Sequence, residues 1–253
     1  MPYFAGLMAR ETGALVRSFT GEPELHHPVR GRVKGARAFE RFATETHAWL
    51  SERNVSVDDV DRIITPRRGV EEVLLTLDGD QERIELPMAI AADRDDDARI
   101  IELRIYFSTW PLTGGHAIRP PLLQPDPDVN EADLDVVGEY QRALATGDAE
   151  AATAAFEPDA YVCEPAGGPY VHRGQDELRA LYELFFSNGG GIGLEHCTVT
   201  DDGRACALEY NVVRWGRTDL PPQAGIAVYV RGSTGKLAIA RIYDDSDPPL
   251  PSA

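Results

Sequence analysis

Cysteine and basic residues are scarce in this chain of 253 residues. The three cysteines, Cys163, Cys197 and Cys206, show no Cys-x-x-Cys spacing and cannot all pair, which argues against a zinc knuckle or a disulfide framework and fits a reducing cytosol. Lysine and arginine number 25 against 42 acidic residues, so the net charge is −17. Nucleic acid or an anionic membrane would require a basic patch, and we therefore expect neither as a partner.

Long apolar segments are also missing from the sequence. No stretch approaches the roughly 18 apolar residues that span a bilayer, and the N-terminal segment MPYFAGLMARETGALVRS lacks the apolar core of a signal peptide. We therefore expect a soluble, cytoplasmic protein. The composition, 43% hydrophobic and 26% charged, is that of a globular protein, and the length suits one large domain or two of about 120 residues.

An internal repeat decides between one domain and two. Residues recur 137 positions apart from the first helical segment to the last strand: Tyr3 and Tyr140, Leu7 and Leu144, Phe19 and Phe156, Pro28 and Pro165, and Arg104-Ile105-Tyr106 and Arg241-Ile242-Tyr243. The segment 119–130 between the copies holds four prolines among acidic residues, which favours an extended linker. We therefore predict two tandem domains at residues 1–118 and 131–253.

The second copy shows helices early and strands late. Apolar spacing predicts a helix from an N-cap at Asn130 to Gly147, a short helix capped by Asp148 that ends near Phe156, and a third helix after Gly174. Apolar alternation and β-branched residues predict strands near residues 161–164, 194–199, 205–215, 225–230 and 237–243. This order predicts an α+β fold in which each copy is a cone-shaped domain, a curved antiparallel sheet with about three helices on one face. Such a cone encloses a cavity for a small ligand.

Several short motifs of the second copy carry a family resemblance. They are Tyr140-Gln-Arg-Ala-Leu-Ala-Thr-Gly-Asp148, Ala-Ala-Phe156-Glu-Pro-Asp159, Val162-Cys-Glu164-Pro165, and the helix that begins at Gly174. Over about 110 residues this order resembles ketosteroid isomerase of the nuclear transport factor two-like superfamily, which includes SnoaL-like proteins. The superfamily contains isomerases, polyketide cyclases, dehydratases, epoxide hydrolases and binding proteins, so the resemblance implies the fold more strongly than the activity.

The resemblance implies roles for particular residues. Tyr140 would donate a hydrogen bond to an oxyanion, Glu164 would move a proton, and Tyr182 would support Tyr140. Ala227 stands at the strand position where the isomerase has its second donor, an aspartic acid. Because loss of one such donor typically costs about 10²–10³ in rate, the substitution places steroid isomerisation itself in doubt.

Each main candidate also has a structural interpretation. Tyr140 and Tyr182 lie on apolar helix stripes, where tyrosine commonly belongs to the core. Glu164 lies between Cys163 and Pro165 at a strand end, where glutamate is commonly a solvated turn residue. Their combination at the family spacing is what favours a pocket.

The later strands supply further candidates for substrate contact. Tyr243 lies on the last strand, and Asp244 and Asp245 follow it, where we expect the two acids to solvate the strand end. Glu209 and His196 lie on middle strands, and either residue faces the cavity or the outer surface of the sheet.

The first copy departs further from the family pattern. His27 occupies the base position, and Tyr3 occupies the donor position at the start of the chain, where helix ends fray, so we do not expect a well-placed donor. We expect a structural or ligand-contact role for His27 and a cavity that is smaller or less polar. His26, His27 and His47 lack the spacing of known metal sites, so we expect no metal.

These observations leave two function classes open. The first is a cofactor-independent isomerase or cyclase, or less expectedly a dehydratase or epoxide hydrolase, that moves a proton on an apolar, carbonyl-containing molecule of polyketide or steroid type. The second is a non-catalytic protein that binds an apolar metabolite. Tyr140, Glu164 and Tyr182 favour the enzyme and Ala227 favours the binding protein. Members of the superfamily often dimerise, and we expect the two copies to form such a pair within one chain.

Overall fold

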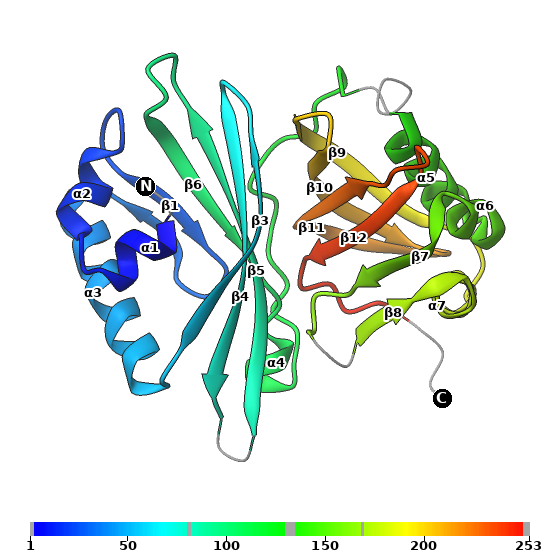
Figure 1. Cartoon of the computed structure of the whole chain (residues 1–253), viewed down its shortest axis with the longest axis horizontal. Helices are drawn as coiled ribbons and strands as arrows, with labels where there is room; N and C mark the ends of the chain where they lie inside the picture. Colours follow the sequence, from blue (N-terminus) through cyan, green and yellow to red (C-terminus); the bar gives the residue numbers. More distant parts are fainter. Residues whose placement is uncertain (1–2, 80–81, 130–134, 168–169, 250–253) are drawn as a thin grey trace. The chain divides into compact units, whose positions relative to one another are not determined.

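The chain folds into two compact units of similar architecture. The computed structural model describes residues 3–79, 82–129, 135–167 and 170–249. One unit comprises residues 1–107 and 111–114, and the other comprises residues 108–110 and 115–253 (Figure 1). Each contains a six-stranded sheet and a few helices, which confirms the predicted α+β class.

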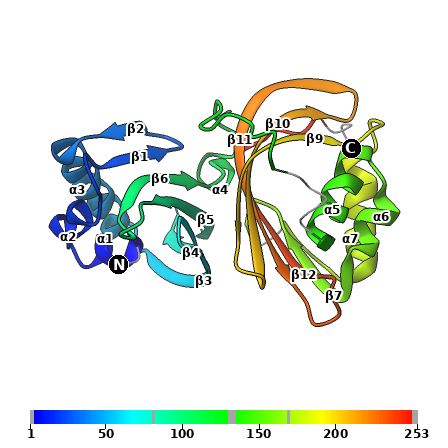
Figure 2. The same cartoon turned by 90° about the horizontal axis from the view of Figure 1, so that it is seen from above.

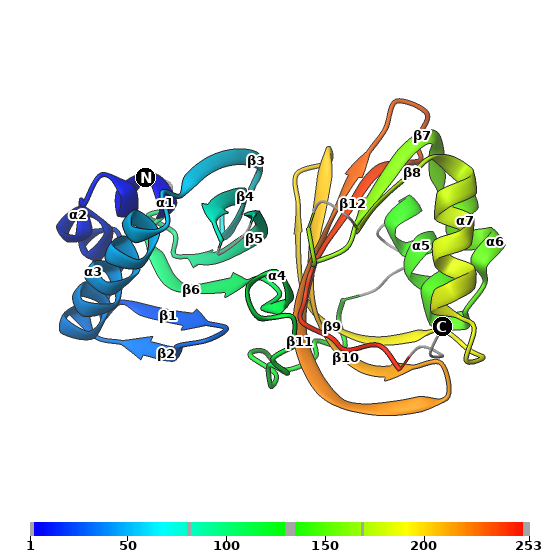
Figure 3. The ribbon, with the colours of Figure 1, turned by 90° about the horizontal axis from the view of Figure 1, so that it is seen from below.

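In the first unit, helices α1–α3 lie together on one face of the sheet (Figure 3). Its elements are α1 (Tyr3–Met8), α2 (Thr12–Arg17), β1 (Glu24–His27), β2 (Gly31–Lys34), α3 (Ala36–Glu52), β3 (Ser56–Ile64), β4 (Arg68–Asp78), β5 (Arg83–Arg94) and β6 (Ile100–Tyr106). The core between helices and sheet includes Phe4, Leu7, Phe39, Val73 and Ile105.

The second unit repeats this arrangement, with α5–α7 against the inner side of a strongly curved sheet (Figure 2). Its elements are α4 (Trp110–Thr113), which the two units share, then α5 (Asp135–Thr146), α6 (Ala149–Ala154), β7 (Phe156–Cys163), β8 (Val171–Arg173), α7 (Gly174–Phe185), β9 (Ile192–Asp201), β10 (Ala205–Trp215), β11 (Thr218–Arg231) and β12 (Leu237–Tyr243).

Strand order is the same in the two sheets. The order is β2-β1-β6-β5-β4-β3 in the first and β8-β7-β12-β11-β10-β9 in the second. Neighbouring strands are antiparallel, as predicted, except that β1 pairs with β6 and β7 pairs with β12 in parallel. Each sheet is therefore mixed, because the first strand of the unit in the sequence pairs in parallel with the last one.

The helices of the second unit begin and end near the predicted residues. The Asp148 carboxylate accepts a hydrogen bond from the Ala151 amide at 2.9 Å and caps α6, as expected. Gly147 ends α5 with a φ of +75°, and a Cβ there would lie 2.6 Å from the Gly190 backbone, so only glycine fits. The expected N-cap Asn130 lies outside the described residues.

Between the two repeats, the proline-rich segment lies against the second unit. The Arg119 carbonyl accepts a hydrogen bond from the Ala224 amide, and the Asp126 amide donates to the His196 carbonyl, both at 2.9 Å. Residues 119–129 form no helix or strand. Among the described residues, no helix is long and apolar enough to cross a membrane.

Candidate functional site

The second unit encloses a cavity of about 610 Å³. Helices α5 and α7 form one wall, and the inner face of the sheet forms the other. Most of the lining is apolar and includes Leu144, Leu181 and Ile242. The polar lining residues are Tyr140, Glu164, Tyr170, His172, Tyr182, Tyr210, Tyr229, Asp244, His116, Ser246 and the exposed Glu177. A largely apolar cavity with a few converging polar groups is typical of a small-molecule site.

Two tyrosines on separate helices meet at this cavity, as the resemblance implied. The Tyr182 hydroxyl on α7 donates to the Tyr140 hydroxyl on α5 at 3.0 Å. Burial raises the pKa of Tyr140 well above its usual value, and burial likewise raises the pKa of Tyr182. Both hydroxyls therefore keep their protons at neutral pH, and Tyr140 retains a proton that it can donate to a ligand.

Glu164 lies just after β7 and shares the cavity with Tyr140. The hairpin formed by β7 and β8 brings His172 beside it, with 2.7 Å between His172 Nε2 and Glu164 Oε1. Burial raises the pKa of Glu164 and the charge of Asp244 acts the same way, while the hydrogen bond from His172 opposes the shift. The result is an oriented carboxylate whose proton affinity exceeds that of an ordinary glutamate.

Asp244 lies at the end of β12 and faces into the cavity beside Ile242. The Tyr210 hydroxyl donates to Asp244 Oδ2 at 2.8 Å, and the Ser246 amide donates to Oδ1 at 3.2 Å. Burial raises the pKa of Asp244, the hydrogen bonds from Tyr210 and Ser246 oppose this shift, and the neighbouring Asp245 charge adds to it. The expectation that Asp244 solvates the strand end is wrong, because a tyrosine on β10 reaches its carboxyl group.

Asp245 turns away from Asp244 and has a different role. Its carboxylate accepts hydrogen bonds from Ser108, from the amide and hydroxyl of Thr109, and from the Ala117 amide at 2.6–3.0 Å. Burial opposes ionisation, yet these donors lower the pKa of Asp245. The prediction of a solvated residue fails here as well, since Asp245 is buried and holds the segments 108–110 and 115–117 of the second unit.

The residues held by Asp245 contribute to the cavity wall. His116 Nδ1 lies 2.9 Å from Asp245 Oδ1, and the Trp110 and His116 rings stack with centroids 4.9 Å apart. Both rings line the cavity. Asp245 therefore positions an aromatic part of the wall without lining the cavity itself.

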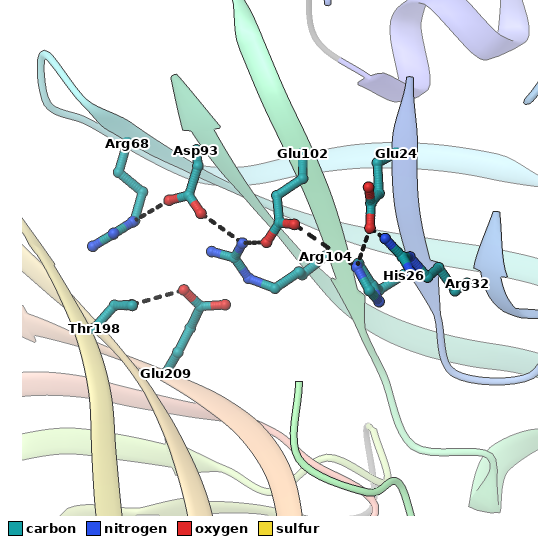
Figure 4. Close-up of polar contacts among 9 residues, drawn as sticks. All are labelled: Glu24, His26, Arg32, Arg68, Asp93, Glu102, Arg104, Thr198 and Glu209. Atoms are coloured by element: carbon teal, nitrogen blue, oxygen red, sulfur yellow. Dashed lines mark hydrogen bonds and ion pairs between the residues drawn. The ribbon is translucent and has the colours of Figure 1, made fainter. Parts of the chain in front are cut away.

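Other predicted residues do not line this cavity. Ala227 is fully buried on β11 within the core. Tyr243 alternates with Ile242 and Asp244, so it points to the opposite face of β12. Glu209 alternates with Tyr210 on β10 and accepts a hydrogen bond from the Thr198 hydroxyl at 2.7 Å (Figure 4). These positions correct our expectation that Tyr243 and Glu209 contact the substrate.

His196 also lies outside the cavity lining. Its Nε2 atom lies 3.3 Å from Gln141 Oε1 on α5, and both side chains are buried.

In the first unit, His27 is part of an aromatic cluster. Its ring makes edge contacts with Phe42 and Phe107, each with centroids 5.4 Å apart, and its Nδ1 accepts from the Val29 and Arg30 amides. His27 does not line the cavity of about 310 Å³ that this unit contains. Tyr3 does line that cavity and is buried, so our expectation that Tyr3 is poorly held at a fraying end is wrong.

The first unit also contains one cluster with potential metal ligands. Donor atoms of Glu24, His26 and Glu102 lie within 4.8 Å of one another (Figure 4). Glu24 already binds Arg32 at 2.6 Å and Lys34 at 2.9 Å, and Glu102 binds Arg104. Because cationic side chains already balance these carboxylates, the cluster carries no case for a metal. His47 instead contacts Arg10 and Ser51, so the three histidines do not gather.

Sequence reasoning missed His172, Tyr210 and Tyr229 as lining residues. His172 could have been found from a hairpin after Pro165, which returns the chain beside Glu164. The two tyrosines follow the alternation of β10 and β11, but register shifts on β10 hide which face is inward.

Comparison with known proteins places the second unit in a family. No curated protein matches this sequence. A Sinorhizobium meliloti protein described as a candidate polyketide cyclase is 23% identical, with 45% of this chain and 98% of that chain covered and a TM-score of 0.38. SalBIII, an epoxide hydrolase/cyclase-like enzyme of pyran ring formation in polyether salinomycin, is 17% identical, with 45% and 91% covered and a TM-score of 0.38. Residues 137–238 match the SnoaL-like domain. Residues 137–238 of the second unit are therefore a SnoaL-like domain.

Proposed function

We propose that the second unit catalyses cofactor-independent proton transfer next to a carbonyl group of an apolar small molecule, as an isomerase or cyclase of polyketide-like or steroid-like compounds. The observation that carries the proposal is the pair of carboxyl groups in one apolar cavity, Glu164 beside a histidine and Asp244 beside a tyrosine. Groups whose surroundings shift their pKa values in a cleft are candidates for acid and base chemistry.

Glu164 is the base in this proposal. Its carboxylate removes a proton from the carbon next to the carbonyl, and the bonding electrons move to the carbonyl oxygen to give an enolate. His172 holds the carboxylate in position at 2.7 Å. In isomerisation, Glu164 returns the same proton to another carbon of the conjugated system. In cyclisation, the enolate carbon instead forms a bond with a second carbonyl carbon of the same molecule. The π electrons of that carbonyl move to its oxygen, which takes the proton back from Glu164 and becomes a hydroxyl group.

Tyr140 and Asp244 stabilise the enolate oxygen in this scheme. The Tyr140 hydroxyl donates a hydrogen bond to the enolate oxygen, and the hydrogen bond from Tyr182 holds the Tyr140 oxygen in position. The scheme assigns Asp244 as the second donor in its protonated form, which burial favours, while the hydrogen bonds from Tyr210 and Ser246 favour the carboxylate. Asp244 would thus replace the second donor that is missing at Ala227. The acid would come from the end of β12 rather than from β11.

A non-catalytic binding protein is the second candidate. Ala227 favours it, because the residue expected to supply the second donor has no polar group. In that case the tyrosines and carboxyl groups would orient an apolar ligand that leaves unchanged.

Deuterium exchange separates the two candidates without knowledge of the natural substrate. The protein is incubated in D₂O with 2-tetralone and a panel of other apolar ketones, and deuterium uptake is followed by mass spectrometry. We expect catalysed exchange at the carbon next to the carbonyl in the wild type and in His27→Ala, and none above background in Glu164→Gln. Ketone binding without catalysed exchange in the wild type would favour the binding protein.

A further inference from the structure

We propose that the first unit contains a second binding site, for a small uncharged molecule that carries a hydroxyl group on an apolar body. The site is the cavity of about 310 Å³ that Tyr3 and Glu71 line together with apolar side chains such as Phe19, Ile90 and Leu103. Ser18, Arg62 and Arg94 also line it, with Arg62 paired to Asp59 and Arg94 donating to the Ala98 carbonyl. Its volume lies at the lower end of the range for small-molecule sites.

Two polar atoms in this cavity have no hydrogen-bond partner among the described residues. They are the Tyr3 hydroxyl and Glu71 Oε1, and both are buried. Tyr3 is only 5% exposed. The Arg62 guanidinium lies 4.0 Å from Glu71 Oε1, which is beyond hydrogen-bond distance. Buried polar groups in folded proteins are nearly always hydrogen-bonded, so two such atoms in one cavity indicate a missing polar partner.

Glu71 is held in place although one of its oxygens lacks a hydrogen-bond partner. The other oxygen, Oε2, accepts a hydrogen bond from the Tyr3 amide at 3.0 Å. This contact joins the start of α1 to β4 and fixes the Glu71 carboxylate, while the Tyr3 ring packs edge-on against Phe4 with centroids 5.2 Å apart. Both polar atoms are therefore positioned before a ligand arrives, which lowers the entropic cost of binding.

The pair of atoms defines the ligand chemistry. A phenol hydroxyl donates one hydrogen bond, and a carboxylate oxygen accepts one. A ligand hydroxyl does both at once, since it can accept from Tyr3 and donate to Glu71. A ligand carboxylate would meet the Glu71 charge at close range, and a hydrocarbon would leave both atoms without partners.

This cavity is not a copy of the second unit's site. At the 137-residue offset, Tyr3 corresponds to Tyr140 and Ala92 to Tyr229, and no other lining residue has a counterpart that lines the larger cavity. Glu71 corresponds to Leu208, which lies in the core of the second unit. The first unit therefore opens a different part of its cone to ligand.

Phenol and toluene test the proposal, because they differ by one hydroxyl against one methyl group. Each is titrated into the full-length protein and amide NMR shifts are followed, with benzoate as the anionic probe. We expect phenol to shift amides around Tyr3 and Glu71 in a saturable way and to bind about tenfold more tightly than toluene, with no effect of benzoate there.

Two variants and one control isolate the hydroxyl contact. Tyr3→Phe should reduce phenol binding to the level of toluene without lowering Tm, because the lost hydroxyl has no partner in the free protein. Glu71→Gln, which keeps side-chain size, should also weaken phenol binding. Tyr140→Phe should leave the first-unit shifts unchanged.

Equal affinities for phenol and toluene, an unaffected Tyr3→Phe variant, or no shifts with any probe would overturn the proposal and assign the two atoms to water. These signals come from first-unit amides, so the outcome is independent of catalysis in the second unit.

Discussion

The two units share strand order and a constant offset of 137 residues, yet they differ where the second unit carries its polar groups. Glu164 corresponds to His27 and Asp244 to Phe107. In the first unit, His27 packs against Phe107 at 5.4 Å between ring centroids. In the second, both positions line a cavity of about 610 Å³. An aromatic contact thus replaces a pair of carboxyl groups.

The cavity tyrosines follow the same pattern. Tyr210 corresponds to Val73 and Tyr229 to Ala92, and the first unit builds its sheet with these apolar side chains. The fold therefore does not require the polar residues. Buried carboxyl groups are costly unless they are bonded or neutral, so a role in ligand chemistry explains their presence better than a role in stability.

Exchange of the base should have the largest effect and the greatest contrast between units. Glu164→Gln removes the proton acceptor, and we expect a loss of about 10³-fold in kcat with ligand affinity nearly unchanged. The matched variant His27→Ala should stay within several-fold of wild type. Both variants are compared with the wild type by the kcat and the equilibrium affinity for a ketone whose deuterium exchange the protein catalyses. A thousandfold loss of kcat in a folded His27→Ala variant would show that the active site has been assigned to the wrong unit.

Removal of the donor hydroxyl gives the next largest effect. Tyr140→Phe should lower kcat by about 10²–10³, because one oxyanion donor is lost while the ring stays in place. Tyr3→Phe makes the same change at the equivalent position and should leave kcat unaltered. Steady-state kinetics of the two variants measures the difference. An equal loss of kcat in Tyr140→Phe and Tyr3→Phe would contradict the account.

The pH dependence of activity should reveal the two carboxyl groups. Glu164 must be ionised, so kcat/KM should rise with pH through its raised pKa, above the usual value of about 4.3. Asp244 must be protonated, so the rate should fall as Asp244 ionises. Asp244→Asn keeps a hydrogen-bond donor that does not ionise. In this variant, kcat/KM should therefore no longer show the decrease with pH that ionisation of Asp244 causes. An unchanged profile in this variant would exclude Asp244 as the acid.

The smallest expected effect concerns the stability of the first unit. Arg32 and Lys34 lower the pKa of Glu24 to about 2, whereas the second unit has Tyr161 at the corresponding position. The contribution of Glu24 is fully present above its unfolded pKa of about 4.3 and is lost as the pH falls toward 2. Because the partners are half exposed, we expect Glu24→Gln to cost only about 1 kcal/mol at neutral pH. Urea unfolding at several pH values measures this, and an equal cost at pH 7 and pH 2 would contradict it.

Much of the fold followed from sequence, because the repeat and the helix caps are local signals. The offset between Tyr3 and Tyr140 indicated two units, and Asp148 caps its helix as predicted. Tyr140 and Tyr182 could be paired from the family resemblance. Their contact at 3.0 Å agrees with that interpretation.

The rest of the site depends on contacts between strands, which one sequence does not specify. Register shifts on β10, at Glu209 and Tyr210 against β9 and near Val212, obscure which side chains face inward. The hydrogen bond from Tyr210 to Asp244 joins residues 34 positions apart. The sequence made Asp244 a candidate for substrate contact but favoured solvation of the strand end, and the structure places Asp244 in the cavity lining.

A carboxyl NMR titration tests the central claim most directly, because it needs no substrate. The protein is labelled with ¹³C at the Asp and Glu carboxyl carbons, and Glu164→Gln and Asp244→Asn assign the two resonances. The account predicts that both titrate above the ordinary values of about 4.3 for Glu and 3.9 for Asp, with Asp244 protonated to higher pH than Glu164. Ordinary titration of both groups, or ionisation of Asp244 before Glu164, would contradict a proton-transfer site in the second unit.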